Sequence, residues 1–125
     1  MKKEISTTNA PAAIGPYSQG VEKNGIVFVS GQLPVDSKTG ETAKGGIKGQ
    51  TLQIFKNIEA ILKEVDMTLD NVVKTTVFLT DMADFADMNE VYASQFSGTF
   101  PARSAFAVKG LPKNADIEIE VIAVR

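Results

Sequence analysis

The segment Ile47–Val65 constrains the fold most, because its apolar residues repeat at the spacing of an α-helix while those on either side alternate. Its main apolar stripe consists of Leu52, Phe55, Ile58, Leu62 and Val65. Ile54 and Ile61 widen this stripe, and the opposite face is polar, with Glu59 and Lys63 spaced as a favourable helical ion pair. The pattern predicts an amphipathic helix that covers one face of a β-sheet.

The segments around this helix have the patterns of β-strands. Ile26–Ser30 follows the turn Asn24-Gly25, so we expect a hairpin with a strand at about 18–21. Val72–Leu79 alternates with period two and carries apolar residues on both faces. We therefore expect this strand to be at least partly buried on both sides.

A second, shorter helix is predicted after the strand at 72–79. Asp81 or Asp84 can cap its N-terminus, and Gly98 is a suitable stop at its C-terminal end. Its apolar stripe consists of Phe85, Met88, Tyr92 and Phe96. Two more strands follow, at about 104–108 and 117–124, with a turn between them.

The predicted order is β-β-α-β-α-β-β in one α+β domain that spans residues 1–125. Right-handed crossovers would place both helices on the same face of a mixed sheet and leave the other face uncovered. Four apolar residues are poorly suited to remain in water on that face, namely Val72, Phe78, Ile122 and Val124. We therefore expect a closed homo-oligomer with functional sites in the clefts between subunits.

Composition argues against several classes of function. The chain has no His and no Cys, so we expect no metal and no cofactor, and catalysis would rest on carboxylates, Tyr, Ser, backbone amides and water. The lack of Cys fits a reducing compartment, and no secretory signal or membrane span is recognisable. We expect a cytoplasmic protein with no membrane partner. A net charge of -2 without a basic stripe also argues against nucleic-acid binding.

Arg103 is the first candidate for ligand binding, because the only other arginine is the C-terminal Arg125. A guanidinium group holds a carboxylate with two parallel hydrogen bonds, which the ammonium group of lysine cannot do. Arg103 is therefore a candidate clamp for a small carboxylic acid. An ordinary surface or intersubunit ion pair is the alternative.

Six short blocks stand out along the chain: 9–20 (NAPAAIGPYSQG), 29–34 (VSGQLP), 73–79 (VKTTVFL), 101–104 (PARS), 111–113 (LPK) and 117–123 (IEIEVIA). In this order and spacing they resemble the Rid family of reactive intermediate deaminases, also called the YjgF group. The resemblance runs from about Asn9 to the C-terminus.

The resemblance implies a chorismate-mutase-like fold, a homotrimer and three clefts between neighbouring subunits. It also implies hydrolysis of 2-imino acids, such as 2-iminopropanoate and 2-iminobutanoate, to 2-oxo acids and ammonia. These imines hydrolyse unaided, so a catalyst that mainly positions its substrate is sufficient. The expected ligand is a small 2-imino or 2-oxo acid.

By the same resemblance, Arg103 binds the substrate carboxylate, and backbone amides near Gly31 and Ala105 hold the other end of the substrate. Glu120 matches an acidic residue that holds and polarises the attacking water. Position 105 is Ala where many close members have Cys. We expect the chemistry to survive this change, although substrate preference or a site of redox modification could differ.

Tyr17, Ser30 and Asn89 also match site positions of the family, and each has a structural alternative. Tyr17 follows a stiff Gly-Pro pair and would orient substrate or water, or form a half-buried aromatic lid. Ser30 could equally be a strand-end cap, and Asn89 a structural hydrogen-bond donor. Glu118 points to the same strand face as Glu120, and we interpret Glu118 as part of a solvated strand edge.

Two other functions stay open. A non-catalytic trimer that binds 2-oxo acids or amino-acid metabolites and regulates a partner would use the same Arg103 clamp. Glu120 favours the enzyme, because a carboxylate receptor gains nothing from a second negative group near its ligand. RNA cleavage or inhibition of translation, which is attached to parts of the family, is disfavoured by the acidic composition and the absence of His.

Overall fold

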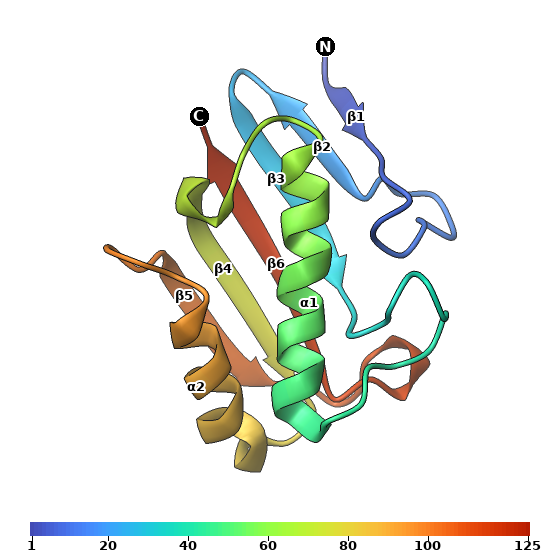
Figure 1. Cartoon of the computed structure of the whole chain (residues 1–125), viewed down its shortest axis with the longest axis vertical. Helices are drawn as coiled ribbons and strands as arrows, with labels where there is room; N and C mark the ends of the chain where they lie inside the picture. Colours follow the sequence, from blue (N-terminus) through green and yellow to red (C-terminus); the bar gives the residue numbers. More distant parts are fainter.

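A six-stranded mixed sheet forms the frame of the molecule, and the computed structural model describes residues 1–125 (Figure 1). In chain order the strands are β1 (Lys3–Ile5), β2 (Gly20–Lys23), β3 (Ile26–Gln32), β4 (Val72–Leu79), β5 (Ala102–Ala107) and β6 (Ile117–Val124). Their spatial order is β1-β2-β3-β6-β4-β5, and only the β4–β5 pair is parallel. The predicted α+β class with a mixed sheet is confirmed.

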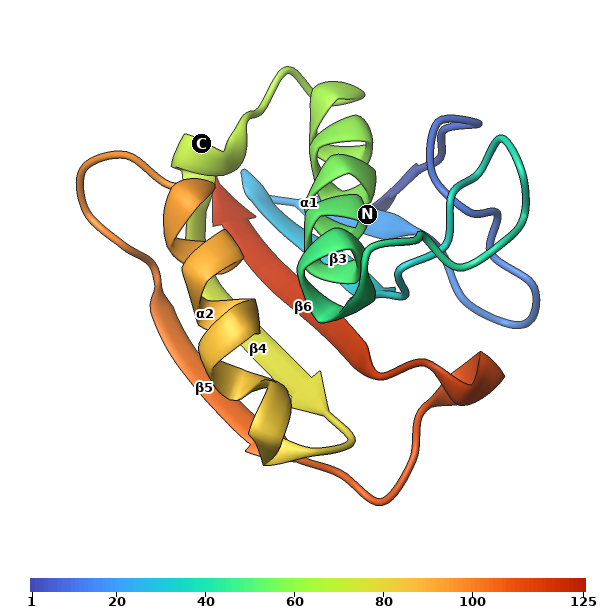
Figure 2. The ribbon, with the colours of Figure 1, turned by 60° about the horizontal axis from the view of Figure 1, so that its bottom comes forward.

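The two helices are α1 (Gly46–Lys63) and α2 (Phe85–Ser94), and both lie on the same face of the sheet (Figure 2). Short 3₁₀ turns occupy Leu69–Asn71, Met82–Asp84 and Pro112–Asn114. The buried stripe of α1 is centred on Ile54, Ile58 and Ile61, which are fully buried. Leu52 lies outside this stripe and is exposed, so its predicted place on the apolar face is wrong.

A hydrophobic core of 21 buried residues fills the space between the helices and the sheet. Along β6, Ile117, Ile119 and Val121 face the helices and are buried, whereas Glu118 and Glu120 face away from them. The central strand therefore carries two carboxylates on the face that the helices leave open. Neither helix is both long enough and apolar enough to cross a membrane.

The second helix begins as predicted but ends earlier. Asp81 accepts a hydrogen bond from the backbone N–H of Ala83 and caps the 3₁₀ turn that leads into α2, whereas the Asp84 side chain caps nothing. Gln95 closes the helix, because its N–H bonds to the carbonyl of Tyr92. The prediction that Gly98 stops the helix is wrong, since Gly98 (φ 79°) lies in the loop that follows.

Three further strand predictions need correction. β1 was not predicted, because three residues are too few to carry a periodic signal. β5 begins at Ala102, earlier than expected, so that Arg103 lies within a strand. Val72 is buried and does not lie on the open face, because the β4–β6 register shifts between Val72 and Lys74.

The face of the sheet opposite the helices carries large apolar side chains. Phe28 is 50% exposed and pairs across the strands with Ile122. Phe106 is 46% exposed and contacts Phe78 edge to face, with ring centroids 5.4 Å apart. Val124 is exposed on the same face, as predicted. Exposed apolar patches of this kind mark interaction surfaces.

Candidate functional site

Four of the predicted site residues line one cavity between β3, β6 and the loop 11–18. The cavity has a volume of about 630 Å³, and its polar lining includes Tyr17, Ser30, Gly31, Lys113, Glu118 and Glu120. Ile14, Leu33 and Val35 form part of an apolar wall. The cavity therefore combines two carboxylates, one ammonium group and a phenol with an apolar surface. No group of three or more acidic side chains is arranged to hold a metal ion.

Glu118 is the more deeply placed of the two carboxylates. It is half-buried, whereas Glu120 is exposed. Burial, and then the neighbouring charge of Glu120, raise the pKa of Glu118 above its ordinary value. The interpretation of Glu118 as part of a solvated strand edge is therefore wrong. The role predicted for Glu120 stays a prediction.

Gly31 leaves the space that the Glu118 side chain occupies. A Cβ atom at position 31 would lie 2.6 Å from Oε2 of Glu118 and 2.7 Å from its Cδ, which is too close for a stable contact. Gly31 lies where the β3–β6 register shifts between Val29 and Gln32. The absence of a side chain in this irregular part of β3 therefore lets Glu118 fold back against the strand.

Tyr17 is 53% exposed on the loop 11–18, and Ser30 holds the end of that loop. The Ser30 hydroxyl donates to the carbonyl oxygen of Ser18 at 2.5 Å, and its N–H donates to the carbonyl oxygen of Gln19 at 2.9 Å. Ser30 lies inside β3, which continues to Gln32, so the strand-end alternative for Ser30 is wrong. Direct contact of Ser30 with substrate stays a prediction.

Arg103 and Asn89 form a second group, where β5 packs against α2. Nη1 of Arg103 donates to Oδ1 of Asn89 at 2.7 Å. The guanidinium carbon lies 4.7 Å from the ring centroid of Tyr92 and 5.4 Å from that of Phe85. No carboxylate pairs with Arg103, since both ion pairs of the chain lie elsewhere. The alternative of a surface ion pair within one chain is wrong, whereas an ion pair between subunits is untested. Asn89 acts as an acceptor toward Arg103.

Tyr92 supplies a fixed aromatic platform for the guanidinium group. Its hydroxyl and Oγ1 of Thr75 share a buried hydrogen bond of 2.7 Å. Burial raises the pKa of Tyr92, although the bond with Thr75 and the charge of Arg103 oppose this shift. The phenol is therefore neutral near pH 7 (ordinary pKa about 10). A hollow of about 480 Å³ adjoins Arg103 and is lined by Asn89, Tyr92, Ala93, Phe100 and Pro101.

Ala105 follows Arg103 by two residues in β5, so both side chains point to the same face of the sheet. The Ala105 side chain is partly buried and packs against the hydrophobic core. A ligand therefore meets little of this methyl group. Participation of the Ala105 backbone amide in binding stays a prediction.

A single chain keeps the two groups of site residues apart. Arg103 points to the helix-covered face from the edge strand β5, and Glu118 points to the opposite face from β6, with β4 between them. Two strand spacings separate their backbones by about 10 Å. Their cross-strand partners in β4, Thr75 and Phe78, are three residues apart, which adds about 10 Å along the strand. The residues thus form two half-sites within the chain.

Two charged residues of the cavity, Glu118 and Lys113, were not predicted as functional. Glu118 was misassigned because strand alternation gives Glu118 and Glu120 the same face and cannot tell which is buried. Lys113 was missed because it lies in a turn without periodicity. It has a left-handed backbone (φ 56°), as does Asn114 (φ 52°), which is uncommon for residues other than Gly. Gly110, Pro112 and Asn114 signalled a turn there but gave no role to Lys113.

The chain matches a known protein family over most of its length. Residues 7–125 match the family model described as Endoribonuclease L-PSP. A RutC family protein of Pyrococcus horikoshii is 53% identical over 125 residues, which cover 100% of this chain and 99% of the relative. The 2-iminobutanoate/2-iminopropanoate deaminase of Salmonella typhimurium is 49% identical over 128 residues, with coverage of 100% and 99%.

The fold agrees with that of solved structures at similar identity. A protein of the conserved Rid family from Yersinia pestis superposes with a TM-score of 0.96 at 48% identity, over 100% of both chains. Fold, family model and relatives therefore agree with the six sequence blocks. The chain belongs to the Endoribonuclease L-PSP family, the group of Rid proteins that those blocks resemble.

Proposed function

We propose that this protein hydrolyses small 2-imino acids, such as 2-iminobutanoate and 2-iminopropanoate, to 2-oxo acids and ammonia. The observation that carries the proposal is the free guanidinium group of Arg103, which is held on neutral partners and has no carboxylate of its own. A partly exposed guanidinium group without a counter-ion is complementary to a substrate carboxylate. The relationship to a protein named as a deaminase for these imines supports the same reaction.

We also propose a homotrimer in which the Arg103 half-site of one subunit meets the Glu118 cavity of the next. Two observations support this assembly. The half-sites cannot meet within one chain, and the uncovered sheet face carries exposed aromatic side chains at Phe28 and Phe106. Assembly through that face would bury the aromatic rings, and contact of the edge strand β5 with the next subunit would bring Arg103 to the cavity of that subunit.

In this site Arg103 holds the substrate carboxylate and Glu118 handles the proton of water. One edge of the guanidinium group is occupied by Asn89, and the remaining N–H groups stay free for two parallel bonds to a carboxylate. The pKa of Glu118 is shifted upward, in the direction of neutral pH, which suits a group that takes and returns a proton.

The proposed reaction balances without a cofactor. The imine enters with a protonated nitrogen, and the oxygen of water adds to the imine carbon as one water proton passes to Glu118, which gives a neutral carbinolamine. Glu118 then returns this proton to the nitrogen. The C–N bond breaks as the hydroxyl proton passes back to Glu118 and the carbonyl group forms, and the departing ammonia takes that proton and leaves as ammonium. Glu120 and Tyr17 line the same cavity and would orient the water and the substrate.

Cleavage of RNA, which the description of the family model names, is not the function that we propose here. The cavity contains two carboxylates and a single lysine, so it would repel a phosphate backbone. The chain also lacks His and has a net charge of -2.

The test is a coupled assay in which a threonine dehydratase generates 2-iminobutanoate and semicarbazide traps the imine that remains. We expect wild type to accelerate imine loss and Arg103→Ala to lower kcat/KM by about 100-fold, since two charge-assisted hydrogen bonds are lost. Arg103→Lys should recover little, because an ammonium group cannot make the bidentate contact.

Arg125→Ala is the matched control, since Arg125 is the other arginine and pairs at the surface with Glu22. It should keep the wild-type rate. If wild type does not accelerate imine loss but binds 2-oxobutanoate in calorimetry, the protein is a metabolite-binding member of the family and the proposed reaction is wrong.

A further inference from the structure

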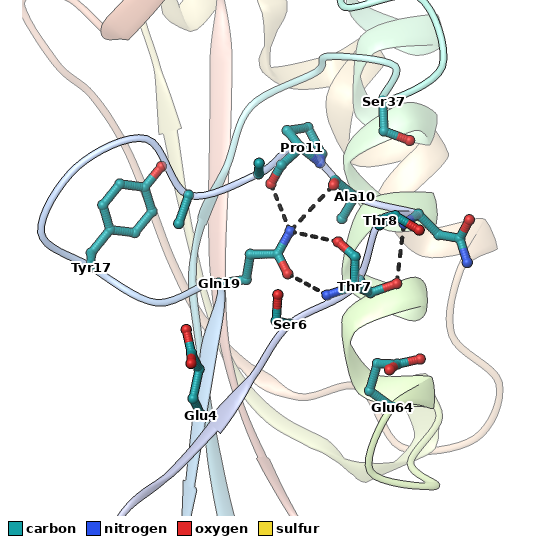
Figure 3. A pocket seen from close by; sticks show the side chains of 13 residues that line it. Glu4, Ser6, Thr7, Thr8, Ala10, Pro11, Tyr17, Gln19, Ser37 and Glu64 are labelled. Carbon is teal, nitrogen blue, oxygen red and sulfur yellow. Dashed lines mark hydrogen bonds between the residues drawn. The ribbon is translucent and has the colours of Figure 1, made fainter.

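A buried glutamine, Gln19, ties the N-terminal segment to the loop beside the cavity (Figure 3). It is only 3% exposed. Its Oε1 accepts a hydrogen bond from the N–H of Thr7 at 2.7 Å. Its Nε2 donates to the carbonyl oxygens of Thr7, Ala10 and Pro11 at 3.0, 3.2 and 2.8 Å. Both polar atoms of the side chain are therefore hydrogen-bonded within the protein.

The loop 11–18 has few other attachments. Its one internal backbone hydrogen bond joins the N–H of Tyr17 to the carbonyl oxygen of Gly15 at 2.9 Å. At its far end the carbonyl of Ser18 accepts the hydroxyl bond from β3. Between these points Ile14 is 78% exposed and Tyr17 is 53% exposed, so packing contributes little to the position of either side chain. The bonds of Gln19 at the near end are thus a main restraint on the loop.

The same loop forms a wall of the cavity that holds Glu118. Ile14 and Tyr17 both line that cavity, and Tyr17 also lines a second hollow beside Thr7 and Gln19. Figure 3 shows the loop leaving Pro11, passing Tyr17 and returning to Gln19. A change in the attachment at Gln19 would therefore move Tyr17 relative to Glu118.

We propose that Gln19 is a positioning residue of the active site. Gln19 also lines the cavity, but both polar atoms of its side chain are already hydrogen-bonded within the protein. It therefore acts by holding the loop that places Ile14 and Tyr17 over Glu118. The kinetic part of this proposal rests on the proposed deaminase function, whereas the effect on the loop does not.

The test compares Gln19→Met with Gln50→Met in the full chain. Met has a similar volume to Gln and removes all four hydrogen bonds of Gln19. Gln50 is the matched control, because it is also buried, bonds to Asp116 and lies outside the cavity. Chymotrypsin cleavage after Tyr17, followed by mass spectrometry on the native protein, reports the order of the loop.

We expect Gln19→Met to be cut after Tyr17 about tenfold faster than wild type and to lose about tenfold in kcat/KM, since small displacements of positioning groups are costly. Gln50→Met should match wild type in both measurements. In the Tyr17→Ala background, Gln19→Met should have no further effect on kcat/KM, because both changes act through the same loop.

Equal cleavage rates in the two Met variants would overturn the proposal, as would an effect of Gln19→Met that adds fully to that of Tyr17→Ala. If Gln19→Met does not fold, Gln19→Glu keeps the shape and the bond from Thr7 but turns the donor into an acceptor. This variant should also be cut faster. If wild type has no deaminase activity, the proposed function fails, and the cleavage rates alone decide the role of Gln19.

Discussion

At the scale of residues, the neighbours of Arg103 leave its charge unpaired, and the surroundings of Glu118 raise its pKa. Asn89 and Tyr92 orient the guanidinium group without neutralising it. Burial raises the pKa of Glu118, and the charge of Glu120 adds to this shift. An unpaired cation and a carboxyl group with a raised pKa are both electrostatically costly, and such costs concentrate at functional sites.

Replacing Glu118 by Gln should lower activity while it raises stability near neutral pH. Because the folded pKa of Glu118 is raised, the folded protein holds this proton more tightly, and stability falls as pH rises from the ordinary glutamate pKa of about 4.3 toward the folded pKa. Glu118→Gln should melt above wild type near neutral pH and at the same temperature in acid below that range. Its kcat/KM should fall about 100-fold.

Calorimetry over a pH series and the coupled assay measure the two effects. Glu41→Gln is the matched control for stability, since Glu41 is exposed and forms no ion pair, and it should leave the melting temperature unchanged. A melting temperature of Glu118→Gln below that of wild type near neutral pH would contradict the assigned burial.

Replacing Gly31 by Ala should displace the Glu118 carboxyl group, because the new Cβ would lie 2.6 Å from Oε2. The displaced atoms belong to the end of a flexible side chain, so we expect a loss of about 1 kcal/mol or less in the free energy of unfolding. The kcat/KM should fall about tenfold or more through misplacement. Gly110→Ala is the control, since a Cβ there meets open space. Equal activities of the two variants would refute the argument.

At the scale of elements, a buried polar side chain connects α1 to the cavity wall. Asn57 on α1 is 1% exposed, and its Nδ2 donates to the carbonyl oxygens of Leu33 and Val35 at 3.2 and 3.0 Å. Its Oδ1 accepts from Gln53 at 2.9 Å. Leu33 and Val35 line the cavity, so α1 fixes one wall of the site while its apolar stripe packs on the sheet.

Replacing Asn57 by Ala should lower the free energy of unfolding by about 3 kcal/mol, since two buried carbonyl groups lose their donor. Lys56→Ala, at an exposed position of the same helix, should change it by less than about 0.5 kcal/mol. Urea denaturation measures both. A small effect of Asn57→Ala would mean that water replaces the lost donor and that α1 does not fix the wall.

At the scale of the whole molecule, assembly of several copies would account both for the open sheet face and for the separation of Arg103 from Glu118. Phe28 and Phe106 are exposed on the face opposite the helices, and Arg103 and Glu118 are held in separate half-sites. Contact between copies through this face would bury the aromatic rings, and contact of the edge strand β5 with the next copy would bring the half-sites together. Assembly and activity are therefore expected to depend on each other.

Replacing Phe28 by Glu should abolish both the trimer and the activity, because a charge would be buried in the subunit contact. Met82→Glu is the control, since Met82 is similarly exposed but lies in the turn before α2. Light scattering should give three times the chain mass for wild type and for Met82→Glu, and the chain mass for Phe28→Glu. A monomeric wild type that is fully active would exclude the intersubunit site.

The sequence by itself determined the type and order of the larger elements. The helical period of Ile47–Val65 and the strand periods of Val72–Leu79 and 117–124 each span enough residues to be read locally. The strand period also put Glu118 and Glu120 on one face of their strand, and the handedness of the crossovers put both helices on one face of the sheet. The single internal Arg103 was recognisable because only one side chain type holds a carboxylate with two parallel bonds.

Only the tertiary structure decided which of these residues work together. The burial of Glu118, the inward turn of Val72 and the need for Gly31 all depend on strand register and its irregularities, which arise from pairing between distant segments. The separation of Arg103 from Glu118 depends on strand order, which local periodicity does not encode. The hydrogen bonds of the Gln19 amide to Thr7, Ala10 and Pro11, on which its proposed role rests, form only in the folded chain.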